Sequence, residues 1–178
     1  MNAIHHASSD RRSGLNGLGI VYRSRRAALA TILCLCAVLM PGSSAYAGDR
    51  PFGGSCNTVF ALTGVGAAEY EGTCHLLHLG LTRVVATQIV IPNPDGTLFI
   101  PSVAVYTAAN GDELFANFIG IAVFTGPTSA LLSGTETYVG GTGRFANASG
   151  SAALNGPAEF TSATGGVAEY TVQGTISY

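Results

Sequence analysis

The residues best suited to chemistry lie past the middle of the chain, where Glu136 and Tyr138 are two positions apart. That spacing puts both side chains on one face of a strand, and a turn at GGTG (140–143) would bring Asn147 of the next strand close to Glu136. A glutamate facing an apolar interior has a raised pKa and can act as an acid or base. The three side chains together can hold a carbonyl or hydroxyl group of a ligand. If this face points outward instead, Glu136 is a solvated charge.

Two more polar residues interrupt the most apolar stretches of the sequence. Arg83 can anchor an anionic head group of a ligand, or it can pair with a carboxylate across a subunit interface. Asn117 either contacts a ligand or satisfies a local backbone group. We therefore take Arg83 and Asn117, with Glu136, Tyr138 and Asn147, as candidate ligand-binding residues.

The sequence lacks the motifs of several other chemistries. It contains no Gly-x-Ser-x-Gly motif, so a hydrolase nucleophile has no support. His75 and His78 are three residues apart, which puts them on opposite faces of a regular strand. They therefore cannot converge on one metal ion. We expect no metal site and no cofactor.

The first 47 residues have the features of an export signal. Arginines at 23–26 precede an apolar run at 27–40, and the small-x-small sequence AYA ends at Ala47. The run is shorter than the roughly 20 residues that span a bilayer, so we expect cleavage after Ala47 rather than a permanent membrane anchor. The sequence SRRAAL also resembles a twin-arginine signal, which leaves the export route open. The expected division is a helical signal peptide, 1–47, and one secreted or periplasmic domain, 48–178.

The domain that remains after cleavage is acidic. It keeps three basic residues, Arg50, Arg83 and Arg144, against nine acidic ones, and has no lysine, which gives a net charge of −6. So few cations cannot neutralise a phosphate backbone. We expect no nucleic-acid partner.

Cys56 and Cys74 are the two cysteines of this domain. An even pair in an exported chain is most simply a disulfide. In a hairpin centred on Val65, Cys56 and Cys74 stand directly opposite each other, at the separation that disulfides prefer. Such a bridge stabilises the fold by about 3 kcal/mol in the chain-entropy model.

The domain has the sequence pattern of strands and turns. The last segment alternates apolar and polar residues along 168–178, and glycine-rich or asparagine-rich turns recur at short intervals, for example NPDG at 93–96 and NGD at 110–112. Eight or nine strands in a meander predict an all-β fold, either an antiparallel barrel or a two-sheet sandwich. We favour the eight- or nine-stranded barrel.

The apolar pattern also predicts the register of the last hairpin. A turn centred on Gly165 pairs Phe160 with Tyr170 on the apolar face. A slip of one residue would set Phe160 opposite a polar residue, so the pattern disfavours it.

Two segments, 81–91 and 113–124, are apolar on both faces. One face of each would fill the barrel, and in a domain without helices the other face needs a second subunit to cover it. We expect a homo-oligomer, a dimer or a trimer, with its interface on these strands. In a sandwich the same segments would be central strands.

The glycines of GGTG permit a sharp barrel corner, after which residues 144–146 are expected to continue as strand. A phosphate-binding loop would need a helix at that point. The segment YVGGTGRFANASGSA resembles the corresponding corner of allene oxide cyclases and dirigent proteins. CHLLHLG (74–80), YTAANGDEL (106–114) and VQGTISY (172–178) are similar to exported bacterial proteins with the same GTGRF corner.

This resemblance spans most of residues 56–178 and implies an eight-stranded barrel, often trimeric, with a central cavity. Allene oxide cyclases close an unsaturated fatty epoxide, whereas dirigent proteins bind and orient phenoxy radicals. The leading expectation is therefore an exported barrel that binds a small apolar molecule in its lumen. The alternatives are a cyclase or isomerase acting on an unsaturated lipid or polyketide-like substrate, and a structural or surface-interaction protein without a ligand.

Overall fold

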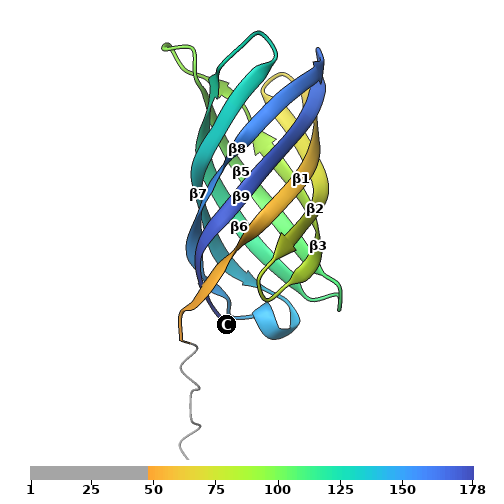
Figure 1. Ribbon diagram of the computed structural model, residues 1–178, viewed down its shortest axis with the longest axis vertical. Helices are drawn as coiled ribbons and strands as arrows, with labels where there is room; N and C mark the ends of the chain where they lie inside the picture. Colours follow the sequence, from red (N-terminus) through yellow and green to blue (C-terminus); the bar gives the residue numbers. More distant parts are fainter. Residues whose placement is uncertain (1–47) are drawn as a thin grey trace, which may run out of the picture. The chain divides into compact units, whose positions relative to one another are not determined.

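The computed structural model describes residues 48–178, which form nine β-strands and one short 3₁₀ helix (Figure 1). The predicted signal peptide, 1–47, lies outside the described residues. In chain order the elements are β1 (Arg50–Gly64), β2 (Ala67–Leu76), β3 (Gly80–Ile89), β4 (Ile91–Pro92), β5 (Leu98–Ala108), β6 (Glu113–Phe124), β7 (Ser129–Gly141), η1 (Gly143–Phe145), β8 (Ser149–Ser162) and β9 (Gly165–Ser177).

The strands close into an antiparallel barrel. The sheet order is β3-β2-β1-β9-β8-β7-β6-β5-β4, and a further pairing of β3 with β5 completes the ring. Eight strands make up the cylinder, while the two-residue β4 pairs only with the start of β5. The predicted all-β barrel is confirmed, and the sandwich alternative is wrong. No helix within residues 48–178 is long and apolar enough to cross a membrane.

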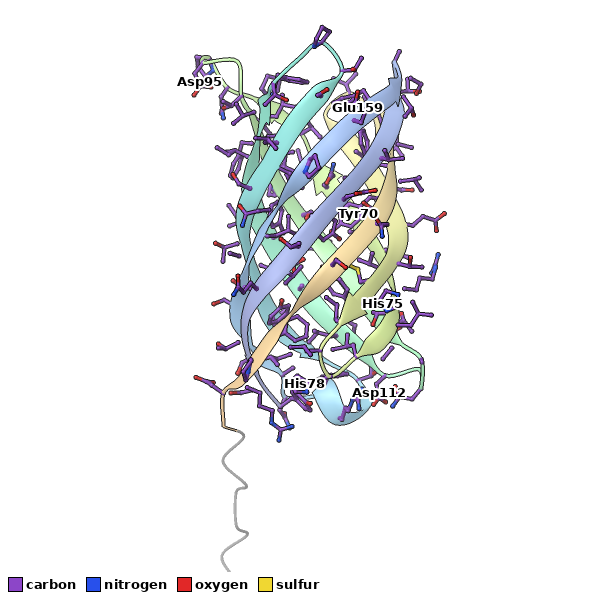
Figure 2. All side chains as sticks on the ribbon, viewed as in Figure 1. Tyr70, His75, His78, Asp95, Asp112 and Glu159 are labelled. Atoms are coloured by element: carbon purple, nitrogen blue, oxygen red, sulfur yellow. A yellow bond between two sulfur atoms is a disulfide. The ribbon has the colours of Figure 1, made fainter. Side chains whose placement is uncertain are left out.

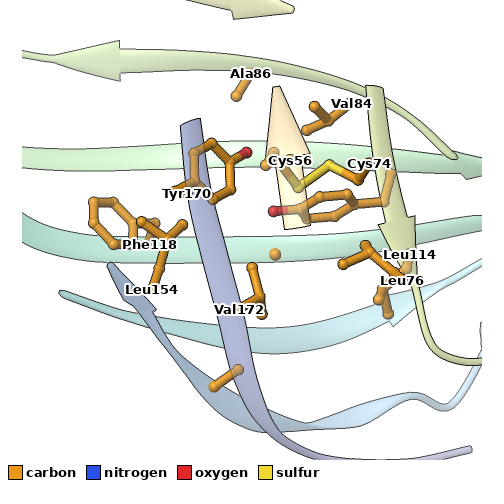
Figure 3. Packing of buried hydrophobic residues seen from close by; sticks show 14 of the residues in the cluster. Cys56, Cys74, Leu76, Val84, Ala86, Leu114, Phe118, Leu154, Tyr170 and Val172 are labelled. Carbon is orange, nitrogen blue, oxygen red and sulfur yellow. A yellow bond between two sulfur atoms is a disulfide. The ribbon is translucent and has the colours of Figure 1, made fainter. Parts of the chain in front are cut away.

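Side chains alternate between the inside and the outside of the barrel along every long strand. In every long strand the side chains with even residue numbers face inward. The turns therefore do not change which of the two sets, odd or even, faces the lumen. Buried apolar side chains from several strands pack together inside the barrel (Figure 3). Large side chains fill the half of the barrel nearest η1. These include Phe52, Leu76, Leu114, Tyr138 and Ile176, and the rings of Phe52 and Tyr138 meet edge to face at 4.9 Å.

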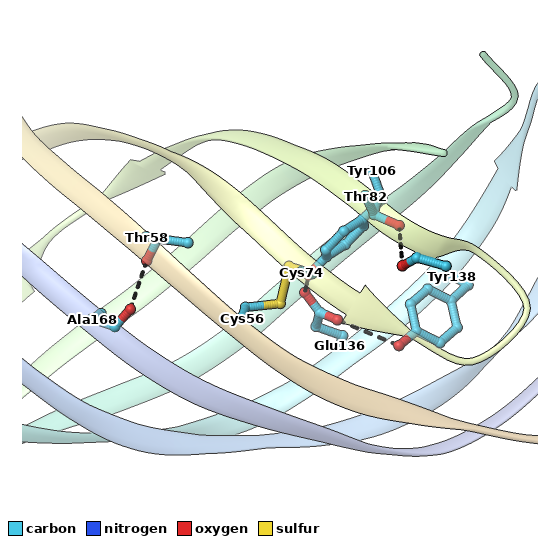
Figure 4. Close-up of a disulfide and its surroundings, with 9 residues drawn as sticks. Cys56, Thr58, Cys74, Thr82, Tyr106, Glu136, Tyr138 and Ala168 are labelled. Atoms are coloured by element: carbon cyan, nitrogen blue, oxygen red, sulfur yellow. Dashed lines mark hydrogen bonds between the residues drawn. A yellow bond between two sulfur atoms is a disulfide. The ribbon is translucent and has the colours of Figure 1, made fainter. Parts of the chain in front are cut away.

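The first hairpin has the predicted register. Cys56 lies opposite Cys74, and the two form a disulfide with a Cα–Cα distance of 4.0 Å. Both cysteines are buried and face the lumen, so the bridge joins β1 to β2 from the inside of the barrel (Figure 4).

The predicted register of the last hairpin is wrong. Phe160 lies opposite Gly166, and Tyr170 packs against the backbone of Gly156. Each large side chain thus faces a glycine, which leaves room for its ring inside the barrel. Phe160 and Tyr170 still face the interior, because the register differs from the expected one by an even number of residues.

The segment after GGTG forms η1, so the expectation that residues 144–146 continue as strand is also wrong. Gly143 adopts a φ of 53°, and the Phe145 amide donates a hydrogen bond to the Thr142 carbonyl at 2.9 Å. The Phe145 side chain turns under the barrel, is fully buried, and contacts Tyr178 with ring centroids 4.9 Å apart. Phe145 therefore closes this end of the barrel.

Arg144 holds η1 against the neighbouring turns. Its Nη2 donates to the His78 carbonyl at 2.6 Å, and its Nε lies 3.7 Å from an Asp112 carboxylate oxygen. His78 and Asp112 mark this closed end in Figure 2. The GTGRF sequence thus has a structural role, which is to cap one end of the cylinder.

Candidate functional site

A pocket occupies the half of the barrel that is farther from η1. Its cavity volume is about 90 Å³. Asp95 and Glu159 mark the end of the barrel to which it leads (Figure 2), and its rim includes Leu62, which is 38% exposed. The lining is mainly apolar and is formed by Thr58, Phe60, Leu62, Tyr70, Gln88, Val90, Leu98, Ile100, Ser102, Phe118, Ala122, Ala130, Leu132, Leu154, Ala158, Phe160, Ala168 and Tyr170.

Two glycines shape the inner part of this pocket. Gly120 of β6 and Gly134 of β7 lie opposite each other, and a Cβ added at either would come within 2.7 Å of the Phe118 ring. Without side chains there, the Phe118 ring can lie flat against the barrel wall. Phe118 in turn lies opposite Ser102 on β5 and Glu136 on β7.

Glu136 is buried completely, with 0% of its surface exposed. The Tyr106 hydroxyl donates to Glu136 Oε1 at 2.5 Å, and the Tyr138 hydroxyl donates to Oε2 at 3.4 Å (Figure 4). Each carboxyl oxygen of Glu136 therefore has one phenol partner. No cation takes part in these contacts, so the negative charge of an ionised Glu136 is stabilised by hydrogen bonds alone.

Burial controls the protonation of this cluster. Loss of solvation raises the pKa of Glu136 to about 7, although the hydrogen bonds from Tyr106 and Tyr138 oppose this shift. Burial also raises the pKa of Tyr70, Tyr106, Tyr138 and Tyr170 above the ordinary phenol value, and the charge of Glu136 adds to this effect. Near neutral pH the tyrosines are therefore uncharged donors, and Glu136 exchanges a proton.

Two hydroxyls at the pocket wall lack any partner. Ser102 Oγ and the Tyr170 hydroxyl are buried, and neither has a partner in good hydrogen-bond geometry, although the Tyr70 hydroxyl lies beside both. The two residues are 7% and 5% exposed, respectively, and both line the pocket. A buried hydroxyl without a partner costs free energy, so the fold places two donors here without using them internally.

The structure brings two of the five predicted site residues together, Glu136 and Tyr138. Asn147 lies exposed after η1, and the β8 residue opposite Glu136 is Ala152, so the expected approach of Asn147 to Glu136 is wrong. This prediction assumed that residues 144–146 continue as strand, whereas they form η1 and its C-terminal end.

Arg83 and Asn117 point away from the lumen. The Arg83 side chain is 62% exposed, and its Nη2 lies 2.9 Å from Glu71 Oε2 on the adjacent strand. Asn117 is exposed on the outer face of β6. Neither residue faces the pocket.

Four residues of the site were missed from the sequence, namely Tyr70, Ser102, Tyr106 and Tyr170. The alternation of residues along β5 could have identified two of them. Ser102 and Tyr106 lie on the same face of this strand as the small Ala104, opposite the face that points outward. Polar residues among small apolar ones on one face indicate a lumen position.

Within residues 48–178 there is no group of three or more His, Cys, Asp or Glu side chains that could hold a metal ion. His75 faces outward on β2, whereas His78 lies in the following turn with a φ of 69°. His78 Nε2 lies 3.0 Å from the Pro51 carbonyl oxygen, which ties the turn to β1.

Together, the fold and the site define a class of protein: a closed eight-stranded antiparallel barrel, capped at one end, with an apolar pocket above a buried glutamate–tyrosine cluster. No family model matches the chain, and comparisons with curated proteins and with solved structures give no match.

Proposed function

We propose that the protein binds a small apolar molecule in the pocket of its barrel. The observation that carries this proposal is the pocket itself, a mainly apolar cavity of about 90 Å³ inside a barrel whose other half is packed. Burying apolar ligand surface against such a lining contributes about 0.8 kcal/mol per CH₂ group. A barrel that served only as scaffold would be more stable with this space filled.

The resemblance to allene oxide cyclases and dirigent proteins is part of the proposal, and the eight-stranded antiparallel barrel with a cavity supports it. Export to the periplasm or the medium is also part of it. The Cys56–Cys74 disulfide supports export, because such bonds persist in oxidising compartments.

A cyclase or isomerase that uses the same pocket is the second candidate. It is favoured by Glu136, whose pKa of about 7 suits proton transfer at neutral pH. However, Glu136 does not line the pocket, whereas Ser102 and Tyr170 do. Binding without turnover therefore needs fewer assumptions.

Filling the pocket is expected to weaken ligand binding. Ala122 faces the pocket on β6, and Ala122→Phe puts a ring into the space. We expect the affinity for n-heptane, measured by headspace gas chromatography over the protein, to fall about tenfold or more, because contacts with at least two CH₂ groups are lost. Ala130→Leu is a smaller substitution with the same direction of effect.

The matched control is Gln173→Phe, which adds the same ring on the outer face of β9, away from the pocket. Its heptane affinity should equal that of the wild type. If the wild-type protein takes up no heptane, and mass spectrometry under native conditions finds no co-purified apolar molecule, then ligand binding in the lumen is wrong and a structural or surface-interaction role remains.

We further propose that a second copy of the chain covers the outer face of β3, β5 and β6. Apolar side chains gather there: Leu81, Val85, Ile89, Val103, Ile119, Ile121 and Val123 are all exposed. Val103 and Ile119, at 56% and 61%, are among the most exposed. The outer face of β9 is more polar, with Glu169, Thr171 and Gln173 beside the exposed Val167. Single exposed apolar residues also occur on other strands, such as Val59 and Val139, but the three strands β3, β5 and β6 carry the largest group. A contiguous apolar face of this kind is typical of an interface in a dimer or trimer.

Charges on this face are expected to separate the subunits. The double variant Val103→Glu/Ile119→Glu should elute as a monomer in size-exclusion chromatography with light scattering, whereas the wild type should elute as a dimer or trimer. Thr171→Glu/Gln173→Glu adds the same charge to β9 and should leave the mass unchanged. A monomeric wild type at high micromolar concentration would exclude self-association, and the face would then fit a different partner or a lipid surface.

A further inference from the structure

We propose that the ligand is a neutral, unbranched aliphatic molecule with one oxygen function at its buried end, an alcohol, aldehyde or ketone, bound by Ser102 Oγ and the Tyr170 hydroxyl. This inference rests on the proposed function and specifies the ligand class. It follows from the two unpartnered hydroxyls, from the charges around the pocket and from the size of the cavity.

The two hydroxyls are the strongest indication. Ser102 on β5 and Tyr170 on β9 come from different parts of the ring of strands, and both line the pocket without a hydrogen-bond partner. Other polar groups at the site are already engaged: Thr58 Oγ1 donates to the Ala168 carbonyl at 3.1 Å, and Tyr106 and Tyr138 donate to Glu136. Among these groups Ser102 and Tyr170 are the ones that a ligand oxygen can satisfy, and the Tyr70 hydroxyl, which lies beside both, can share that oxygen.

The chemistry of these hydroxyls sets the type of oxygen. A serine and a tyrosine hydroxyl can each donate one hydrogen bond and can also accept. A carbonyl oxygen has two lone pairs and can accept from both, whereas an alcohol can accept from one and donate to the other. Either group has the capacity to pair with two hydroxyls of this kind.

The electrostatics of the pocket exclude a charged end group. The residues that line it include no lysine, arginine or histidine to stabilise a carboxylate or phosphate. Glu136, which interacts with the Tyr170 hydroxyl through its charge, would repel an anion when it is ionised. An anion buried without a cation or several donors is strongly disfavoured.

The volume sets the shape of the ligand. A dry apolar cavity of 150 Å³ holds a benzene molecule, and the present cavity, at about 90 Å³, is smaller. A ring system would force the wall apart. A linear chain can enter with its oxygen first, and any excess length can extend past Leu62 at the rim.

The test compares four seven-carbon probes on the full exported domain: heptan-2-one, heptan-1-ol, heptane and heptanoate. Headspace gas chromatography gives the affinities of the three volatile probes, and calorimetry at pH 8 gives that of heptanoate. We expect heptan-2-one and heptan-1-ol to bind about tenfold more tightly than heptane, since each gains one to two net hydrogen bonds. We expect heptanoate not to bind.

Ser102→Ala and Tyr170→Phe remove the two hydroxyls while keeping the rest of each side chain. In the double variant the preference should be inverted, with heptane bound more tightly than heptan-2-one, because the carbonyl then loses its water without compensation. The heptane affinity itself should stay at the wild-type value, which also shows that the variant is folded.

Thermal unfolding separates a ligand contact from a structural role. Each single variant, without ligand, should melt higher than the wild type by about 2–6 °C, because an unsatisfied buried hydroxyl has been removed. A drop in Tm would show that the hydroxyls stabilise the fold and would overturn the inference.

The remaining outcomes are distinct. If heptane and heptan-2-one bind equally and the variants change neither, the pocket takes apolar ligands, the hydroxyls hold only water, and this inference fails while the proposed function stands. Tight binding of heptanoate would overturn the neutral ligand class. If none of the probes binds and no apolar molecule co-purifies with the protein, the proposed function fails together with the inference.

Discussion

Raising the pH from 4.5 to 8 is expected to remove about 3 kcal/mol of stability through Glu136 alone. Burial raises the pKa of this carboxyl from 4.5 to about 7, so across that interval the folded protein holds a proton that the unfolded chain has released. The stabilisation is therefore complete below pH 4.5 and is lost as the pH rises through 7. Urea titrations at a series of pH values give the free energy of unfolding directly.

Glu136→Gln is the matched control. Glutamine keeps the size of the side chain and an oxygen that can accept from Tyr106, but it does not titrate. The difference between the two proteins isolates Glu136 from other groups, such as Asp95, whose pKa is lowered by hydrogen bonds from Thr97. We expect the difference to change by about 3 kcal/mol over the interval, with the variant more stable at pH 8. Parallel pH profiles would show that Glu136 has the same pKa folded and unfolded.

Phe145→Ala is expected to cost about 3–5 kcal/mol of stability, the range for removing a fully buried aromatic ring. The Phe145 ring is the cap of the closed end, packed on Tyr178 and beneath the Arg144 guanidinium, whose Cζ is 4.8 Å from the ring centroid. The other residues of η1, Gly143 and Arg144, supply no second large apolar side chain. Chemical denaturation measured by circular dichroism reports the loss.

Phe124→Ala provides the comparison for this ring. Phe124 lies at the opposite end of the barrel and is 45% exposed, so its loss should cost about 1 kcal/mol or less. Similar costs for the two substitutions would mean that the closed end does not depend on Phe145.

Much of the barrel follows from the sequence, because alternation is a local property. The alternation in the last segment correctly gives the inward face of β9, and the spacing of Cys56 and Cys74 gives the first hairpin with its disulfide. The eight or nine strands follow from the turn sequences. These features depend only on neighbouring residues, so no three-dimensional information was needed.

Register is harder to predict because the pattern repeats every two residues. A shift by any even number of positions keeps every apolar residue inside, so alternation could not distinguish Tyr170 opposite Phe160 from Tyr170 against Gly156, four residues away. The volume of the rings decides between them, and that depends on both strands at once. The predicted proximity of Asn147 to Glu136 failed for a related reason, since the path of η1 depends on the space beneath the barrel.

The candidate site is nonlocal in the same way. Glu136 and Tyr138 were found because they are close in sequence. Tyr106 and Tyr170 reach the same level of the barrel only through the stagger between strands, a property of the closed ring as a whole. The sequence pattern of a single strand does not reveal this offset between strands, so these contacts could not be predicted from it.

The β3–β5 pairing that completes the ring leaves the cylinder without a free long strand edge. A strand of another molecule therefore finds no row of unpaired amide and carbonyl groups to pair with, which protects the protein from fibril-like stacking. Peeling any one strand away must rupture two ladders together, and at β1 and β2 the disulfide resists this from within. The barrel should accordingly come apart as a single unit, and any association between molecules should proceed through side chains rather than through backbone.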